Sequence, residues 1–253
     1  MVRSDYNVTL GLDRQAEVMG RAATELAIQL LGGQHRLTPT NMHQVGRLPY
    51  RTILYHYVYI YTGTNCRVPV WHKSGGNLWN LCCQASCWTW SQDTGALYCT
   101  VMHFTKCTLQ VYLPEAAHYP HVLEAELRLY RLTGGKVVTR GKDLPKGSVD
   151  LIVTAMEDQE MWSQERCQPW HRSATAWAEA CRAPVLAIDP PPHPPALEVK
   201  MTLVGCLPLH HPPEAGKLYL ANLGIPKNIY KEVGIKFSSP FGAKFVIPLH
   251  ASA

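Results

Sequence analysis

Residues 149–192 read VDLIVTAMEDQEMWSQERCQPWHRSATAWAEACRAPVLAIDPPP, and this stretch decides the fold. Val149 to Ala155 is a short apolar run rich in β-branched residues, which predicts a buried strand. Ala174, Trp177, Ala178 and Cys181 recur at helical spacing, and a proline at position 184 ends that helix. Val185 to Ile188 predicts a second buried strand. Strand, crossover helix and strand form a βαβ unit, and such units build parallel sheets that are covered on both faces.

Asp189 follows the second of these strands directly. Open α/β sheets bind ligands outside the carboxyl ends of their strands, so Asp189 and Thr154 are candidates for the rim of a ligand crevice. The alternative interpretation is that Asp189 only caps the turn that leads into the prolines. The sequence leaves both interpretations open.

Composition describes a globular chain. Of the 253 residues, 46% are hydrophobic and 17% are charged, which favours a packed core over disorder. The net charge of +5 permits an anionic partner such as RNA without requiring one. No apolar run is long enough to cross a bilayer, and the first ten residues lack the core of a signal peptide.

The cysteines favour a cytosolic compartment. Six of the nine lie between Cys66 and Cys107, at spacings typical of neither zinc sites nor paired disulfides. His193, His210 and His211 have no carboxylate or cysteine at ligand spacing, so we expect no metal. The GxSxG, P-loop, HExxH and GxGxxG motifs are absent from the sequence, and we expect no cofactor.

The rest of the chain extends the α/β pattern. Residues 14–31 form an amphipathic helix with a stripe of Val18, Ala22, Leu26 and Leu30, ended by two glycines. Its small residues predict either packing within the domain or a dimer contact. Beyond it we expect strands within 109–115, 199–209 and 217–226, helices at 121–131 and 225–234, and a C-terminal tail at 238–250. The predicted core is Val122, Leu127, Ile152, Val153, Trp177, Leu186, Ile188, Leu203, Leu220 and Val246.

Four blocks carry a family resemblance: AEVMGRAATELAIQLLGG (16–33), DLPKGSVDLIV (143–153), QPWHRSATAWAEACRAPVLAIDPP (168–191) and KLYLANLGIPKNIYKEVGIKFSSPFGAKFVIPLH (217–250). Together they resemble the YjeF N-terminal-type domain of the enhancer of mRNA-decapping protein 3 family. The resemblance implies a Rossmann-like three-layer α/β/α sandwich with a mostly parallel sheet, as one domain over residues 1–253. It also implies a homodimer that contacts mRNA and decapping-complex proteins in cytoplasmic P-bodies.

An enzyme shares this fold, the NAD(P)H-hydrate epimerase, and Asp189 matches the position of its active-site aspartate. The neighbours of Asp189 do not match, because prolines follow it where the epimerase carries a different continuation. Residues 154–165 replace the epimerase's glycine-rich loop. We therefore expect a non-enzymatic scaffold, with an epimerase or a nucleotide sensor as the alternatives. The family's amino-terminal Lsm domain and helicase-binding linker are not in this sequence, so the dimerisation module is what we expect here.

The C-terminal part carries candidate RNA contacts. Lys217, Lys227, Lys231, Lys236 and Lys244 are interleaved with five aromatic residues, Tyr219, Tyr230, Phe237, Phe241 and Phe245. Basic side chains neutralise phosphates and aromatic rings stack on bases. The alternative is a solvated basic face.

Residues 45–108 do not fit the family pattern. We interpret 45–64 as the translation of a retained short intron and the following residues as a reading in the wrong frame, with the correct frame returning near 109. Shifting each codon by one base turns every Trp codon into glycine and gives a basic residue at Gln84. These are the glycine loop and helix arginine that the family places there. A genuine lineage-specific insertion is the alternative.

This interpretation predicts the behaviour of the segment. The β-prone stretch 52–61 takes the place of the missing strand. Residues 62–107 have no amphipathic stripe and are expected to lack regular packing, with exposed Trp side chains.

Overall fold

The computed structural model describes residues 12–33, 52–57, 108–114, 127–128, 130–132, 135–147, 149–157, 162–205, 207, 210–232 and 234–249. In this part of the chain the strands form one sheet of order β3-β2-β1-β4-β5-β6-β7-β8. The pairs are parallel except β7 with β8, which is antiparallel. The strands are β1 Thr52–Tyr57, β2 Thr108–Tyr112, β3 Lys136–Val138, β4 Leu151–Ala155, β5 Val185–Ile188, β6 Met201–Val204, β7 Lys217–Ala221 and β8 Val246–Pro248.

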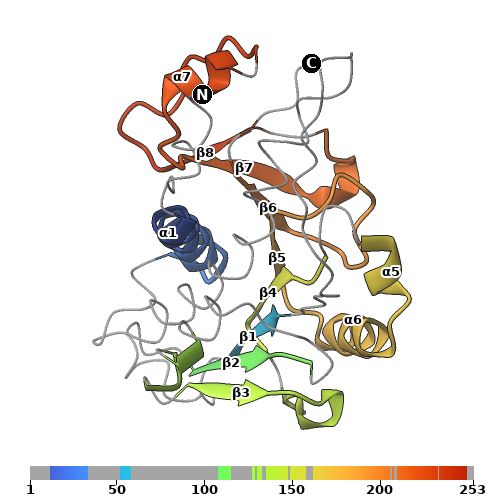
Figure 1. Ribbon diagram of the computed structural model, residues 1–253. Coiled ribbons are helices and arrows are strands. Elements are labelled where there is room, and N and C mark those ends of the chain that lie inside the picture. Colours follow the sequence, from blue (N-terminus) through green and yellow to red (C-terminus); the bar gives the residue numbers. More distant parts are fainter. Residues whose placement is uncertain are drawn as a thin grey trace, which may run out of the picture.

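Helices cover both faces of the sheet (Figure 1). Helix α1 (Leu12–Leu30) lies on one face, where it contacts β5, β6 and β7, and α5 (Trp162–Arg166) and α6 (Pro169–Cys181) lie on the opposite face. Helix α7 (Lys227–Glu232) and the 3₁₀ turns η2 (Gly141–Asp143) and η3 (Pro213–Ala215) complete the described elements. The expected Rossmann-like α/β sandwich is confirmed.

Strand alternation divides the core into two clusters. From β4, Leu151 and Val153 pack on the α1 side of the sheet, whereas Ile152 packs on the α6 side. In β5, Leu186 and Ile188 face α1 while its two other residues face α6. All nine residues of these two strands are buried, as expected of strands with both faces covered.

The N-terminal helix confirms its prediction closely. Ala22 and Ala23 are 1% and 0% exposed, so the small residues allow close packing on the sheet within the domain. The helix ends in a Schellman motif, in which the N–H of Gly33 donates to the carbonyl of Ile28 at 2.8 Å and Gly32 N–H to Gln29 at 3.0 Å. Both glycines have φ of 95°, a conformation that other residues adopt only with strain.

The predicted βαβ unit is confirmed as β4–α6–β5, with one correction in its core. Helix α6 begins at Pro169, earlier than the predicted periodic segment, because proline at the first helical position needs no N–H partner. Trp177 was placed in the core, and it is only half-buried. Its indole Nε1 donates to the carbonyl of Pro145 at 2.9 Å, so the ring lies where its polar edge has a partner.

Some of the remaining predictions fall on described residues and can be compared with the structure, and others do not. Strand β1 confirms that the stretch from Thr52 supplies a strand, paired between β2 and β4. Leu127, predicted in the core, is buried in a helical segment, and Tyr130 of the same segment is buried as well. Val122 and the predictions made for residues 62–107 lie outside the described residues. Strands β3 and β8 were not predicted.

Candidate functional site

The order of the strands identifies a topological switch point. From β1 the chain moves to β2 and β3 on one side, and β4 to β7 lie on the other. Ligands of open α/β sheets bind outside the carboxyl ends of the strands at such a point, which here lies between β1 and β4. Tyr57 pairs with Ala155, so Met156 and Glu157 extend beyond β4 at the switch point. Asp189 follows β5, one strand away.

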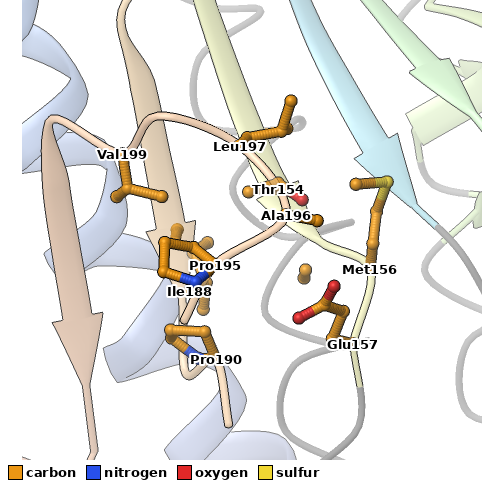
Figure 2. Close-up of a pocket in the computed structure, with 11 residues that line it drawn as sticks. Thr154, Met156, Glu157, Ile188, Pro190, Pro195, Ala196, Leu197 and Val199 are labelled. Atoms are coloured by element: carbon orange, nitrogen blue, oxygen red, sulfur yellow. The ribbon is translucent and has the colours of Figure 1, made fainter. Parts of the chain in front are cut away.

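The crevice beside β4 is filled by the chain itself (Figure 2). The segment after β5 passes over the carboxyl ends of β4 and β5, and Pro190, Pro195 and Leu197 line the crevice together with Thr154 and Glu157. The enclosed volume is about 30 Å³, room for a water molecule or two. Pockets for small ligands measure roughly 300–1,000 Å³. Among the described residues, this crevice does not accommodate a nucleotide.

A network of charged side chains holds the rim of the crevice. Arg166 of α5 donates from Nε to Oε1 of Glu157 at 2.7 Å and from Nη2 to Oε2 at 2.8 Å, a bidentate ion pair. His171 of α6 is 2% exposed, and its Nε2 lies 3.1 Å from Oε1 of the same carboxylate. Both carboxylate oxygens are therefore engaged within the protein.

The same arginine fixes the proline-rich segment. Arg166 Nη2 also donates to the carbonyl of Pro194 at 2.7 Å. Its guanidinium carbon lies 4.9 Å from the ring centroid of Trp162, and the Trp162 ring contacts His193 at 4.3 Å between centroids. The segment that closes the crevice is thus tied to α5 by a hydrogen bond and a ring contact.

The pKa of Glu157 reflects this network. Burial would raise the pKa of this carboxyl, but hydrogen bonds to His171 and Arg166 and the charges of both outweigh burial, so the pKa lies below its ordinary value. The group is ionised at neutral pH and acts as the anion that joins α5, α6 and the end of β4.

The two predicted rim residues do not come together. Thr154 is 8% exposed and lines the crevice. Asp189 does not line it, and its backbone has φ of 45°, a left-handed conformation that Asp tolerates better than most residues. The backbone N–H of Asp189 donates to Leu203 at 2.7 Å, and its Oδ1 accepts a long 3.5 Å hydrogen bond from the N–H of Gly205. This geometry favours the turn-capping interpretation.

The five candidate lysines are exposed and lie in three places. Lys227 and Lys231 are one turn apart on α7, and Lys236 follows shortly after. Lys244 precedes β8, which pairs with the carboxyl end of β7. Lys217 begins β7 and therefore lies at the opposite end of that strand.

The aromatic residues among these lysines are mostly packed. Tyr230 and Phe241 are 6% and 5% exposed. Phe237 stacks on Tyr230 with 4.1 Å between ring centroids. Phe245, 66% exposed, is the aromatic ring of the set that is most open to solvent.

Sequence reasoning missed Glu157, Arg166 and His171. Their separations of 9 and 14 residues follow no helical or strand period. One indication was available: position 171 precedes the predicted inward positions 174 and 178 by three and seven residues, which places a histidine on a buried helical face.

Two further observations concern the described residues. None of their helices is both long and apolar enough to cross a membrane. Their His, Cys, Asp and Glu side chains form no group of three that would suit a metal ion.

The fold is the Rossmann-like YjeF N-terminal type. The crystal structure of a yeast protein of this type, YNL200c, superposes with a TM-score of 0.59 over 96% of this chain and 92% of that one. The two sequences are 10% identical, so the likeness shows the fold alone. No family model matches the chain.

Curated relatives confirm the resemblance seen in the sequence. The chain is 37% identical over 246 residues to enhancer of mRNA-decapping protein 3 of Danio rerio, and 36% identical over 245 residues to the human protein of that name. The match to the Drosophila melanogaster protein is 27% over 278 residues. These matches cover 96% of this chain. The chain spans about two fifths (41%) of the length of the vertebrate relatives.

Proposed function

We propose that this chain is a non-catalytic, YjeF N-terminal-type domain of the mRNA decapping machinery. The observation that carries the proposal is the identity of 36–37% over 96% of the chain to proteins named enhancers of mRNA decapping. The filled crevice supports it, because its own prolines and Leu197 occupy the place where this fold would take a ligand. In this proposal the domain acts in cytoplasmic P-bodies as a homodimeric scaffold for decapping-complex proteins.

Binding to decapping proteins tests the scaffold. The purified chain is immobilised and offered purified components of a decapping complex, with the Glu157→Ala variant as a fold-weakened comparison and an unrelated α/β domain as the control. We expect saturable binding of at least one component by the native chain. Binding no stronger than to the control would overturn the scaffold proposal.

An activity assay separates the scaffold from the enzyme. Epimerisation of hydrated nicotinamide cofactors requires a proton-transferring carboxylate facing a positioned substrate. Asp189 does not line the crevice here. We therefore expect no turnover above background. Turnover that is present in the native chain and abolished in Asp189→Asn would replace the scaffold by the enzyme.

We also propose that the lysines on and near α7 contact RNA. Lys227, Lys231 and Lys236 are exposed on one stretch of chain, and cationic side chains at such a surface bind phosphates by releasing counterions. The affinity for single-stranded RNA should fall as the salt concentration rises. In the triple Lys→Ala variant the affinity should depend less steeply on salt, because the salt dependence scales with the number of phosphates neutralised. Affinity that ignores salt, or that survives the triple substitution, would remove RNA from the proposal.

A further inference from the structure

The net positive charge of the chain is concentrated beside strand β3. Residues 127–142 hold five basic residues and no acidic one, between Glu126 and Asp143. The chain has 24 basic and 19 acidic residues, so 19 of each remain outside this stretch and their charges cancel. The formal net charge of +5 is therefore the charge of this one stretch. We call its five exposed cations the basic edge: Arg128, Arg131, Lys136, Arg140 and Lys142.

Strand β3 is the outer strand of the described sheet on the side away from β8 (Figure 1). The N–H of Leu113 at the end of β2 donates to the carbonyl of Val138 at 2.8 Å, so the polar backbone groups of Val138 face β2. Those of Val137 point away from β2, because successive residues of a strand alternate in direction. An edge that presents its N–H and C=O in this way is a template for another extended chain.

The helical segment before β3 lies against the start of this strand. Gly135 packs so closely on the buried ring of Tyr130 that an added Cβ would clash with it. Leu132 of the same segment is 78% exposed, the most exposed large hydrophobic side chain of the described residues. A single exposed leucine needs no explanation by itself. Here it lies beside an open strand edge and a run of cations, where it offers an apolar contact to whatever binds them.

A strand added to β3 would meet different side chains on its two faces. Val137 packs with the core cluster on the α1 side of the sheet, and Val138 belongs to the cluster on the α6 side. Lys136, two residues before Val138, therefore projects on the α6 side. The helical segment with Arg131 and Leu132 lies on the α1 side, because its buried residues belong to the α1 cluster. Cations are thus available to both faces of an added strand, and a leucine to one of them.

The surface favours an acidic peptide over RNA, the other common polyanion. Single-stranded RNA is bound by aromatic rings together with cations, and Tyr130, the aromatic residue of this stretch, is 0% exposed. A second copy of the chain is disfavoured as well, because pairing through β3 would bring Lys136 of one copy near that of the other. An acidic extended peptide complements both the charge and the open strand edge.

We propose that the basic edge binds an acidic, extended peptide of another protein, which adds to β3 as a further strand. The peptide backbone pairs with Val137, its carboxylates meet Lys136 and Arg131, and an aliphatic side chain on the α1 side packs on Leu132. The inference rests on the scaffold in the proposed function, and it specifies one docking surface and the chemistry of the partner.

Fluorescence anisotropy with the whole chain tests the docking. The probe is a labelled peptide of about ten residues in which glutamate alternates with leucine, and the control peptide carries glutamine in place of glutamate. The probe should bind saturably, and its affinity should fall as the salt concentration rises, because salt screens exposed charges. The control peptide should bind at least about 10-fold more weakly.

Two double variants with the same change in charge locate the bound peptide. Arg131→Glu with Lys136→Glu should weaken binding of the probe at least about 10-fold, because like charges then face each other. Arg182→Glu with Lys200→Glu is the matched control, since both residues are exposed and precede β5 and β6, with β2, β1 and β4 between these strands and β3. Leu132→Asp should weaken binding about 10-fold through the lost apolar contact. The substituted side chains are all exposed, so the melting temperatures should change little.

Amide hydrogen exchange reports the addition of a strand. At saturating probe, exchange of the Val137 amide should slow at least about 10-fold, because a hydrogen bond to the peptide protects it. Contact through side chains alone would leave this amide unprotected.

The outcomes separate this surface from the scaffold. A probe that binds no better than the glutamine peptide, or equally well to both double variants, overturns the inference, and so does binding without protection of Val137. Single-stranded RNA that binds the native chain but not Arg131→Glu with Lys136→Glu, where the probe does not bind at all, would assign the surface to RNA and overturn the inference. The scaffold itself falls only if the purified decapping components also fail to bind. Saturable binding that is lost in the first double variant alone and protects Val137 supports the inference.

Discussion

At Glu157 two physical effects oppose each other. Removing a carboxylate from water costs free energy, whereas the bidentate Arg166 and His171 stabilise the ionised carboxylate through charge-assisted hydrogen bonds. The pKa of Glu157 lies below its ordinary value, so this stabilisation is larger than the desolvation cost. A buried carboxylate satisfied in this way fixes the positions of its partners, and one of them, Arg166, also bonds the proline-rich segment that passes over the crevice.

Glu157→Gln should lower the free energy of unfolding by about 2–3 kcal/mol at pH 7, since Arg166 loses its charged partner. The folded-state pKa is depressed, so the stabilisation is present above the unfolded value of 4.5 and is lost as pH falls through the lower folded value. Urea denaturation of both proteins from pH 7 to pH 3 measures this. The difference should shrink below about pH 4.5. A difference that is constant with pH would show that the charge of Glu157 contributes nothing.

Asp189 allows a residue-scale test of the turn-capping interpretation. Its φ of 45° is tolerated by Asp and Asn and costs a β-branched residue about 1–2 kcal/mol. Asp189→Asn should therefore change the free energy of unfolding by less than about 0.5 kcal/mol, and Asp189→Val should lower it by about 1–2 kcal/mol. Thermal denaturation of the two variants decides. Equal stabilities would indicate that the left-handed turn does not constrain this residue.

At the scale of elements, Gly216 sets the approach of β7 to the segment before β6. It has φ of 70°, and a Cβ added there would lie 2.4 Å from the carbonyl oxygen of Val199, so backbone would have to move. Gly216→Ala should lower the free energy of unfolding by about 2–4 kcal/mol. Gly147→Ala is the control, because a Cβ there meets nothing within 4 Å. Calorimetry of both variants should show a lower melting temperature for the first alone.

Strand β1 is a central strand, because it pairs with β2 on one side and with β4 on the other. Leu54 lies opposite Gln110 of β2 and Ile152 of β4. Proline in a central strand removes a ladder hydrogen bond, so Leu54→Pro should cost about 3 kcal/mol or more, whereas Thr52→Pro at the start of the strand should be tolerated. Urea midpoints of the two variants test the pairing. Indistinguishable midpoints would mean that this stretch is not in the sheet.

The two strands that the sequence identifies most clearly share a physical property. Strands β4 and β5 are buried on both faces, which makes them continuous apolar runs that can be recognised in isolation. Strand β3 has three residues and β8 ends in proline, so neither carries a periodic pattern. These strands exist because neighbouring strands offer them a partner, which is tertiary information.

The candidate site was less predictable than the fold for the same reason. Thr154 could be placed at the crevice because it lies near the carboxyl end of a recognisable strand. The pairing of Glu157 with Arg166 and His171 depends on how α5 and α6 pack against the sheet, and no local pattern encodes that. Asp189 was placed at a strand end correctly, but which strand lies at the switch point follows only from the strand order.

At the scale of the whole molecule, the reading frame of residues 45–108 bears on stability. A parallel sheet needs helices on both faces, and the family pattern supplies a glycine loop and a helix in this region. Residues 79–90 contain Trp and Cys without an amphipathic stripe, so the printed sequence does not encode that helix. Apolar sheet surface that stays uncovered forgoes about 25 cal/mol for each Å².

A frame-restored chain, with residues 45–64 removed and the following codons read one base later to residue 108, should therefore be more stable than the native chain. A few hundred Å² of covered surface corresponds to several kcal/mol, comparable to the net stability of a domain. For a chain of this size each kcal/mol shifts the melting temperature by about 2–4 °C, so we expect a rise of about 10 °C by calorimetry. Acrylamide quenching of Trp fluorescence should find Trp79 and Trp88 exposed in the native chain. The contribution of each ring is obtained by comparing the native chain with Trp79→Phe and with Trp88→Phe. An equal, cooperative melt with both rings protected would show that the segment is a real structural element and that the frame agreement is a coincidence.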